Sequence, residues 1–205
     1  MRHLPRLFAN NRAWAARRLS QDSRFFEHLC ELQAPRYLWI GCADSRVPAN
    51  EIVGLDPGEL FVHRNVANVV RADDLNCLAV LQYAVEILRV TDVIVCGHYG
   101  CGGVRAALGP PGADPLERWI SPIREARRRH AGDLEAQADE AARWRRLCEL
   151  NVMAQVESLR RLPPAAAAWA GGGRLIVHGW IYDLRNGLLR DLDVSVQSAP
   201  PEQAA

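Results

Sequence analysis

The chain has 205 residues, of which 25 are basic and 24 are acidic, and its net charge is +1. This length fits a single domain, and so balanced a charge excludes a bulk electrostatic surface for nucleic acid or for an anionic membrane. Every basic residue is Arg. The absence of Lys excludes P-loop NTPases, protein kinases and Schiff-base enzymes, because each of these needs a functional lysine. We therefore expect neither a nucleic-acid partner nor a membrane partner.

Six cysteines occur along the chain, mostly inside apolar runs. They are Cys30, Cys42, Cys77, Cys96, Cys101 and Cys148. Because the chain is large for a scaffold held together by disulfides, we expect free thiols in a reducing, cytoplasmic compartment, some of them bound to a metal. No apolar run approaches the roughly 18 residues of a membrane-spanning helix.

The N-terminal segment is rich in Arg and carries no acid before Asp22. It weakly resembles a transit peptide, but we favour an amphipathic helix of the mature protein. The apolar spacing predicts a helix over residues 10–33, with Asn10 or Asn11 as its cap. We expect a helical arm at about residues 4–33 that packs on a partner subunit.

Three apolar runs predict buried strands, at residues 37–41, 60–63 and 92–96. Between the second and third runs, Asp73 or Asp74 caps a predicted helix that continues to about residue 88. Continuous apolar strands that alternate with helices are typical of a parallel sheet covered on both faces. Functional residues of such a sheet belong in the loops at the carboxyl ends of its strands.

The charged region at residues 115–160 predicts two helices, with a break near residues 131–132. The Pro- and Ala-rich segment that follows, up to the glycines at 171–173, is interpreted as a connection.

Two further strands are predicted at residues 175–182 and 188–196, joined by a hairpin turn at Asn186 and Gly187. The tail at about residues 198–205 is expected to be disordered. The fold is therefore predicted as one α/β domain over residues 1–205. Its central sheet is mostly parallel and flanked by helices, with an antiparallel edge strand near the C-terminus.

Cys and His residues follow two of the predicted strands. Cys42 comes directly after the first strand, and His98 and Cys101 lie in the loop after the third. Two thiolates and one imidazole suit a tetrahedral Zn²⁺ ion, and three protein ligands leave a fourth position open for water, as in catalytic sites. The sequence therefore predicts one catalytic zinc ion per chain.

Asp44 and Arg46 lie next to the first of these ligands. Asp44 is close enough to accept a hydrogen bond from metal-bound water or to reach the metal itself. Arg46 can hold the carboxylate with a planar, two-pronged guanidinium, a geometry that Lys cannot copy. The alternative is an ion pair that only stabilises the loop.

The pattern Cys-x-Asp-Ser-Arg followed by His-x-x-Cys resembles the β-class carbonic anhydrases, and the resemblance extends from about residue 4 to 196. The matching segments are Leu7-Phe-Ala-Asn-Asn11, Trp39-Ile-Gly-Cys-Ala-Asp-Ser-Arg-Val-Pro48, Gly58-Glu-Leu-Phe-Val-His-Arg-Asn-Val-Ala-Asn68, Gln82-Tyr-Ala-Val85, Cys96-Gly-His98 and His178-Gly-Trp180. The resemblance implies zinc, reversible hydration of CO₂ to bicarbonate by zinc-bound hydroxide, and self-association as dimers or tetramers.

The family resemblance also implies an apolar pocket for CO₂. Its lining corresponds to Phe61, Val66 and Tyr83, with the backbone N–H of Gly102 nearby and Gln33 reaching across a dimer interface. From the sequence alone, the first three would simply be core residues.

One bacterial branch of the family is similar in a further respect, because it binds bicarbonate away from the zinc. The corresponding residues are Trp39, Arg64 and Tyr182. In that branch, an occupied pocket favours a closed state, in which the carboxylate matching Asp44 releases its Arg and becomes the fourth zinc ligand. The resemblance therefore implies inhibition by bicarbonate and by low pH. The alternative is that both aromatic residues only pack and that Arg64 pairs with an acid.

Two other functions are alternatives to CO₂ hydration. The same fold could hydrolyse a CO₂ analogue, carbonyl sulfide or carbon disulfide, and the motifs do not separate these reactions. A closed-site protein that senses bicarbonate or pH is the second alternative. The presence of Asp44 together with Arg46 favours an enzyme, because a protein that only binds has no need of the pair.

Overall fold

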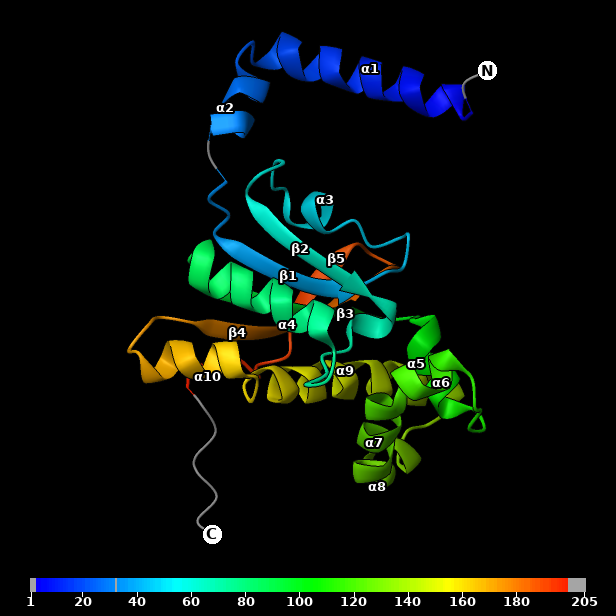
Figure 1. The fold of residues 1–205 in the computed structure, drawn as a ribbon. Helices are drawn as coiled ribbons and strands as arrows, with labels where there is room; N and C mark the ends of the chain where they lie inside the picture. The colour runs from blue at the N-terminus through cyan, green and yellow to red at the C-terminus, as the bar shows by residue number, and fades with distance from the viewer. Residues whose placement is uncertain (1–2, 32, 199–205) are drawn as a thin grey trace. The chain divides into compact units, whose positions relative to one another are not determined.

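The computed structural model describes residues 3–31 and 33–198 (Figure 1). The chain divides into two compact units, Met1–Ala34 and Pro35–Ala205. The predicted disordered tail lies outside the described residues, apart from Ser198. No helix in the described ranges is both long enough and apolar enough to cross a membrane.

The first unit contains two helices, α1 (Pro5–Gln21) and α2 (Phe25–Glu31). The predicted single helix over residues 10–33 was therefore wrong at its start and in its middle. Helix α1 begins at Pro5. Proline is well tolerated at this position, because the backbone N–H that it lacks would have no hydrogen-bond partner in the first turn of a helix. The helix is interrupted after Gln21, where the Asp22 side chain accepts a hydrogen bond from the backbone N–H of Arg24 and favours a turn.

The second unit is built on a five-stranded sheet in the order β2-β1-β3-β4-β5. The first four strands are parallel, and β5 runs antiparallel to β4 at the edge. The strands are β1 (Tyr37–Cys42), β2 (Leu60–Asn65), β3 (Asp92–His98), β4 (Ile176–Asp183) and β5 (Leu188–Asp191). The predicted α/β fold with an antiparallel edge strand is confirmed, and Gly187 adopts the left-handed φ of 73° that the hairpin turn needs.

Helical segments connect the strands. They are α3 (Ala49–Val53), η1 (Val66–Asn68), α4 (Leu75–Gln82), η2 (Tyr83–Ile87), α5 (Gly102–Leu108), α6 (Pro115–Trp119), α7 (Ser121–Arg129), α8 (Ala131–Glu135), α9 (Glu140–Leu159) and α10 (Pro163–Ala170). Asp74 caps α4 as predicted, because its side chain accepts a hydrogen bond from the backbone N–H of Asn76.

Two helix predictions in the second half of the chain were wrong. Residues 115–160 form four helices rather than two, because Pro115 and Pro122 each occupy a first turn and start a new helix. The segment interpreted as a connection is helix α10. Pro163 and Pro164 sit at its first two positions, where they are tolerated, and the alanines after them have the highest helix propensity.

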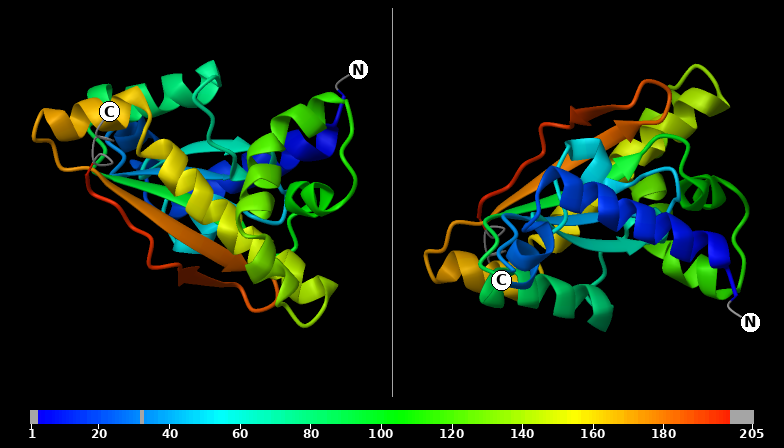
Figure 2. Two further views of the ribbon diagram at one scale, coloured as in Figure 1. Left: turned by 90° about the horizontal axis from the view of Figure 1, so that it is seen from below. Right: turned by 90° about the horizontal axis from the view of Figure 1, so that it is seen from above.

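The two faces of the sheet bury different clusters. Leu38 and Ile40 of β1 point into the larger core, which α4, α9 and α10 cover (Figures 1 and 2). Trp39 points the other way, into a smaller cluster with residues of α3. Helix α9 lies directly against β3 and β4, and a Cβ atom added at Gly97 would lie 2.5 Å from Cγ2 of Val152. Glycine at this position therefore lets α9 pack close to the strand that ends at His98.

Candidate metal centre

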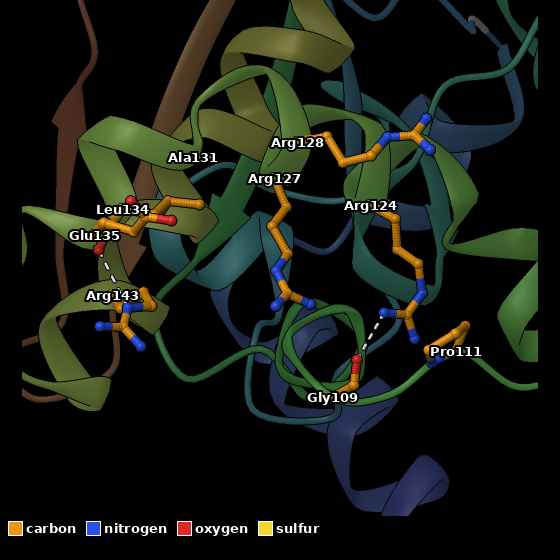
Figure 3. Close-up of a pocket in the computed structure, with 9 residues that line it drawn as sticks. All are labelled: Gly109, Pro111, Arg124, Arg127, Arg128, Ala131, Leu134, Glu135 and Arg143. Carbon is orange, nitrogen blue, oxygen red and sulfur yellow. Dashed lines mark hydrogen bonds between the residues drawn. The ribbon is translucent and has the colours of Figure 1, made fainter.

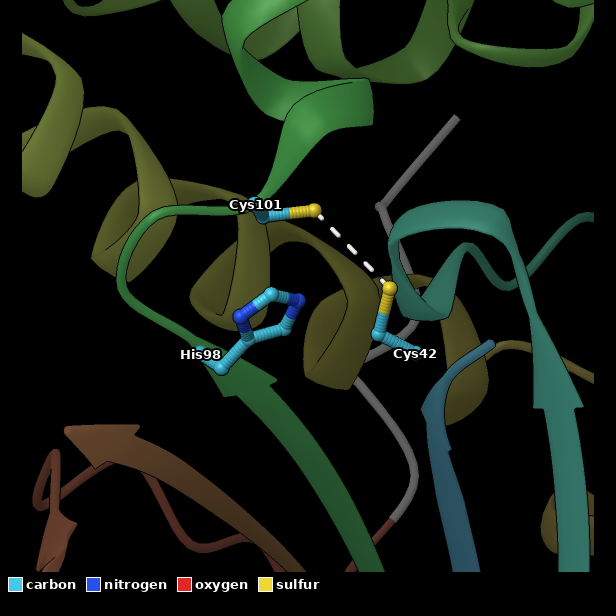
Figure 4. A group of neighbouring side chains, drawn as sticks. All are labelled: Cys42, His98 and Cys101. Carbon is cyan, nitrogen blue, oxygen red and sulfur yellow. Dashed lines mark hydrogen bonds between the residues drawn. The ribbon is translucent and has the colours of Figure 1, made fainter. Parts of the chain in front are cut away.

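Three side chains with metal-ligating atoms meet at the carboxyl end of the sheet (Figure 4). Cys42 is the last residue of β1, His98 is the last residue of β3, and Cys101 caps the start of α5. Because β1 and β3 are parallel neighbours, their ends lie side by side. The ligand atoms all lie within 4.8 Å of one another, and all three residues are buried. The structure thus brings the predicted zinc ligands together.

The geometry of this group fits zinc. Two Zn–S bonds of about 2.3 Å at a tetrahedral angle place the sulfurs roughly 3.8 Å apart, and the sulfurs of Cys42 and Cys101 are 3.9 Å apart. The ring Nδ1 of His98 lies 3.0 Å from the carbonyl oxygen of Tyr99, which can only accept, so Nδ1 carries the proton. Nε2 therefore offers a lone pair, and it is buried without a hydrogen-bond partner. A metal ion would satisfy this atom.

The thiols of Cys42 and Cys101 have shifted pKa values. A hydrogen bond from the Cys101 thiol lowers the pKa of Cys42 to about 4 against the opposing effect of burial. The same hydrogen bond raises the pKa of Cys101. The backbone N–H of Ala67 also donates to Cys42 Sγ, at 3.3 Å. The pair therefore shares one proton, which a cation bound by both sulfurs would displace.

Asp44 lies beside this group and is held by Arg46. The guanidinium of Arg46 donates from Nε to Oδ1 and from Nη2 to Oδ2, and its backbone N–H donates to Oδ1. These hydrogen bonds keep the pKa of Asp44 well below its usual range. Oδ2 lies 3.7 Å from Nε2 of His98. An ionised carboxylate is thus fixed next to a ligand atom.

The residues expected to line a CO₂ pocket are partly brought together. The rings of Phe61 and Tyr83 lie 5.9 Å apart. Val66 is 41% exposed and Tyr83 is 43% exposed. Gly102 is the first residue of α5, directly after a ligand, and it is exposed. Gln33 belongs to the unit Met1–Ala34, so its expected position across an interface stays a prediction.

The three residues expected to bind bicarbonate lie on one face of the sheet. Trp39 is buried in the smaller cluster, and Tyr182 packs against the same cluster. Arg64 donates from Nε to the carbonyl oxygen of Cys42 at 2.8 Å and from Nη2 to the carbonyl oxygen of Asp44. Within the described residues, the hydrogen bonds of the Arg64 guanidinium therefore go to backbone carbonyl oxygens of the metal-ligand loop.

A second group of possible ligands is present within the described ranges, formed by His63, Asp74 and Cys77. The Asn65 side chain donates to Nε2 of His63, and burial lowers the pKa of this histidine. Burial also raises the pKa of Cys77 to about 12. Because the thiol stays protonated and the imidazole nitrogen already has a partner, this group fits a packed core better than a metal site.

A pocket of about 550 Å³ lies away from both groups (Figure 3). It is lined by Gly109, Pro111, Arg124, Arg127, Arg128, Ala131, Leu134, Glu135 and Arg143. None of the predicted site residues lines it. Arg124 and Arg127 donate to the last carbonyl groups of α5 there, so these arginines stabilise a helix end.

Several residues that touch the metal-ligand loops were not predicted from the sequence. The indole Nε1 of Trp144 donates to the carbonyl oxygen of Cys101 at 3.0 Å, and Ala67 donates to Cys42. Trp144 lies 43 positions from its partner along the chain. The only available signal was its place on the apolar stripe of a predicted helix, which does not distinguish a packing residue from one that supports a ligand.

Comparisons with known proteins agree with this geometry. A family model for carbonic anhydrases matches residues 37–189. The chain is 48% identical over 189 residues to a carbonic anhydrase of Emericella nidulans, which covers 92% of this chain and 83% of the relative.

Solved structures are similar as well. A β-carbonic anhydrase of Coccomyxa in complex with acetazolamide has a TM-score of 0.91 and 40% identity, covering 97% of this chain and 90% of the other. One of two tetrameric β-carbonic anhydrases from Sordaria macrospora has a TM-score of 0.88 and 40% identity. The match covers 93% of this chain and 96% of the other. The zinc-type ligand group, the fold and these similarities agree. The chain therefore belongs to the β-class carbonic anhydrases, zinc enzymes that hydrate CO₂.

Proposed function

We propose that this carbonic anhydrase uses Asp44 and Arg46 as its catalytic pair beside zinc held by Cys42, His98 and Cys101. The observation that carries the proposal is the ionised Asp44 carboxylate, 3.7 Å from the unpaired Nε2 of His98. Zinc, when bound, supplies a Lewis acid that makes hydroxide available near neutral pH. Every other requirement of the reaction has to be met by the side chains around it.

Asp44 has the properties of an orienting acceptor. Its pKa is low because Arg46 donates to both carboxylate oxygens, so it accepts hydrogen bonds and does not take up the proton that the reaction releases. Arg46 also approaches the carbonyl oxygen of Gly100, at 3.4 Å, in the loop that carries the other two ligands. The pair therefore fixes the direction from which the nucleophile meets CO₂.

The proposed substrate pocket is apolar because CO₂ has no net charge. Phe61, Val66 and Tyr83 supply the apolar surface, and the backbone N–H of Gly102 supplies one donor. Gln33 from a second copy of the chain would complete the pocket. The exposure of Val66 and Tyr83 supports an assembly of two or more copies, because such an assembly would cover them. The tetrameric relative from Sordaria macrospora supports the same proposal.

We further propose that bicarbonate inhibits the enzyme by binding at Trp39, Arg64 and Tyr182. Arg64 couples this pocket to the active site, because its guanidinium holds the carbonyl oxygens of Cys42 and Asp44. An anion that draws the guanidinium away releases this loop. Asp44 could then leave Arg46 and take the open position at the metal, which excludes water. Low pH would favour the same closed state.

The switch can be tested with two conservative variants and one matched control. Tyr182→Phe and Trp39→Phe each remove a polar group from the pocket and keep an aromatic ring. Tyr37→Phe makes the same kind of change at an aromatic residue of the same apolar cluster that is not assigned to the anion site. We expect the first two variants to lose inhibition by bicarbonate and to gain activity at low pH, whereas the control should behave as wild type. Unchanged bicarbonate and pH dependence in both variants would rule the switch out.

The same assays separate the alternative functions. Stopped-flow hydration of CO₂ should far exceed sulfide release from carbonyl sulfide or carbon disulfide. A closed-site sensing protein would bind zinc and bicarbonate with no turnover at any pH, and the Asp44–Arg46 pair argues against it. The buried free thiols of Cys77, Cys96 and Cys148 support the proposal of a reducing, cytoplasmic compartment.

A further inference from the structure

We propose that helix α9 supplies positioning residues for the zinc site, and that buried Asn151 and Gln155 hold a strained backbone segment so that the N–H of Ala67 points at the sulfur of Cys42. The proposal rests on the zinc site described above. It concerns side chains that do not touch the metal or the substrate and that act through the backbone.

The strained segment follows β2. Ala67 and Asn68 are consecutive non-glycine residues with positive φ values of 64° and 49°. Both are fully buried, with 0% and 1% exposure. A left-handed conformation is unfavourable for a residue with a side chain, and it persists only where the surroundings impose it. Two such residues in succession beside a metal ligand therefore need an explanation.

Two side chains of helix α9 hold the segment in this conformation. The amide Nδ2 of Asn151 donates to the carbonyl oxygen of Ala67 at 3.0 Å, and the backbone N–H of Val70 donates to Oε1 of Gln155 at 2.8 Å. Nε2 of Gln155 donates to Oδ1 of Asn151 at 2.9 Å, which fixes the orientation of both amides. Asn151 is 1% exposed and Gln155 is 0% exposed. Buried amides rarely occur without such a task, because burial costs them their hydrogen bonds to water.

This backbone conformation affects the metal ligand Cys42. With its carbonyl oxygen held by α9, Ala67 turns its N–H toward Cys42 Sγ, at 3.3 Å. A hydrogen bond to a thiolate sulfur fixes its orientation and draws charge from it, and outer-sphere contacts of this kind tune metal sites. Asn151 thus acts on Cys42 through the backbone of a single residue, Ala67. Gln155 supports it by orienting the Asn151 amide and holding the N–H of Val70.

The other two ligands depend on the same helix. Trp144 donates to the carbonyl oxygen of Cys101. The Tyr99 hydroxyl donates to Oε1 of Glu149 at 2.6 Å, and the carbonyl oxygen of Tyr99 accepts the Nδ1 proton of His98. Each ligand therefore has an outer partner that α9 holds. A helix that only covered the sheet would need apolar residues at these positions.

The test compares zinc retention with stability. Asn151→Leu and Gln155→Met remove the amides at similar volume. Val156→Ala removes buried apolar atoms that face Gly179 of β4 from the same helix and leaves both amides in place, and it serves as the control for simple destabilisation. Each zinc-loaded protein is mixed with a coloured chelator, and the rate of zinc release is followed. The cobalt-substituted proteins are examined by absorption, because sulfur-to-cobalt bands report on the thiolates.

We expect both amide variants to release zinc roughly 10- to 100-fold faster than wild type and to shift the sulfur-to-cobalt band. Val156→Ala should lower the midpoint of thermal unfolding and leave release and absorption unchanged. Gln155→Glu keeps the acceptor for Val70 and, when ionised, lacks the donor to Asn151, so it should release zinc at a rate between those of wild type and Gln155→Met.

Release rates and spectra that match wild type in all three amide variants would overturn the proposal. If Asn151→Leu and Gln155→Met do not fold, Gln155→Glu alone decides between the two results. Failure of the zinc site itself would be recognised separately, because wild-type protein would then contain no zinc.

Discussion

The guanidinium of Arg46 grips the carboxylate of Asp44 at both oxygens, with Nε 2.9 Å from Oδ1 and Nη2 2.7 Å from Oδ2. The two residues are only two positions apart, and the backbone N–H of Arg46 closes the same turn. A negative charge is thereby fixed at the mouth of the metal site. The proposed orientation of the nucleophile by Asp44 depends on this arrangement.

Arg46→Lys should impair catalysis although the positive charge is kept. An ammonium group cannot donate to both oxygens in one plane, so Asp44 would lose its fixed orientation. We expect kcat/KM for CO₂ hydration to fall roughly 10- to 100-fold, with zinc content unchanged. Arg161→Lys, at an exposed arginine in the turn after α9 that pairs with Glu157, is the control and should behave as wild type. Activity within twofold of wild type would show that the paired hydrogen bonds from Arg46 to Asp44 are dispensable.

His63 should make stability depend on pH. Burial lowers its pKa, so between the ordinary value near 6.5 and the lower value in the fold, the unfolded chain binds a proton that the folded protein does not. The free energy of unfolding should therefore fall as the pH drops below about 6.5. One proton sets a maximum slope of about 1.4 kcal/mol per pH unit.

The check is urea unfolding of zinc-loaded wild type and of His63→Gln over this pH range. The difference between the two proteins isolates His63, because the metal ligands titrate equally in both. The wild type should lose stability faster as the pH falls. If the free energies of unfolding of the two proteins change with pH in parallel, His63 has the same pKa in the folded and the unfolded protein.

Gly97→Ala should separate α9 from β3. The added Cβ would lie 2.5 Å from Cγ2 of Val152, which is too close for any carbon pair. We expect a loss of about 1–3 kcal/mol in the free energy of unfolding. Adding Val152→Ala should make the double variant more stable than the sum of the two single effects predicts. Strict additivity would show that the contact does not limit the approach of α9.

The parallel sheet and the zinc ligands could be predicted from the sequence because their signals are local. The apolar runs that end at Cys42 and His98 mark two strands, and parallel strands necessarily bring those ends together. Helix α10 was missed because two prolines were interpreted as breakers, although a first turn tolerates them.

The support for the ligands could not be predicted in the same way. Asn151 meets Ala67 across 84 positions of sequence, and Gln155 meets Val70 across 85. Nothing in the local pattern indicates a positive φ at an alanine, because that conformation is imposed by tertiary contacts. The metal ligands lie at the ends of strands and helices. The residues that hydrogen-bond to their backbone or sulfur atoms are determined by tertiary packing.

The central claim is that zinc held by Cys42, His98 and Cys101 makes this chain a carbonic anhydrase. The most direct test measures zinc per chain in purified protein together with stopped-flow CO₂ hydration before and after chelation. We predict one zinc per chain, loss of activity in proportion to zinc removed, and full recovery on adding one equivalent. The absence of zinc in active protein, or activity that survives its complete removal, would contradict the account.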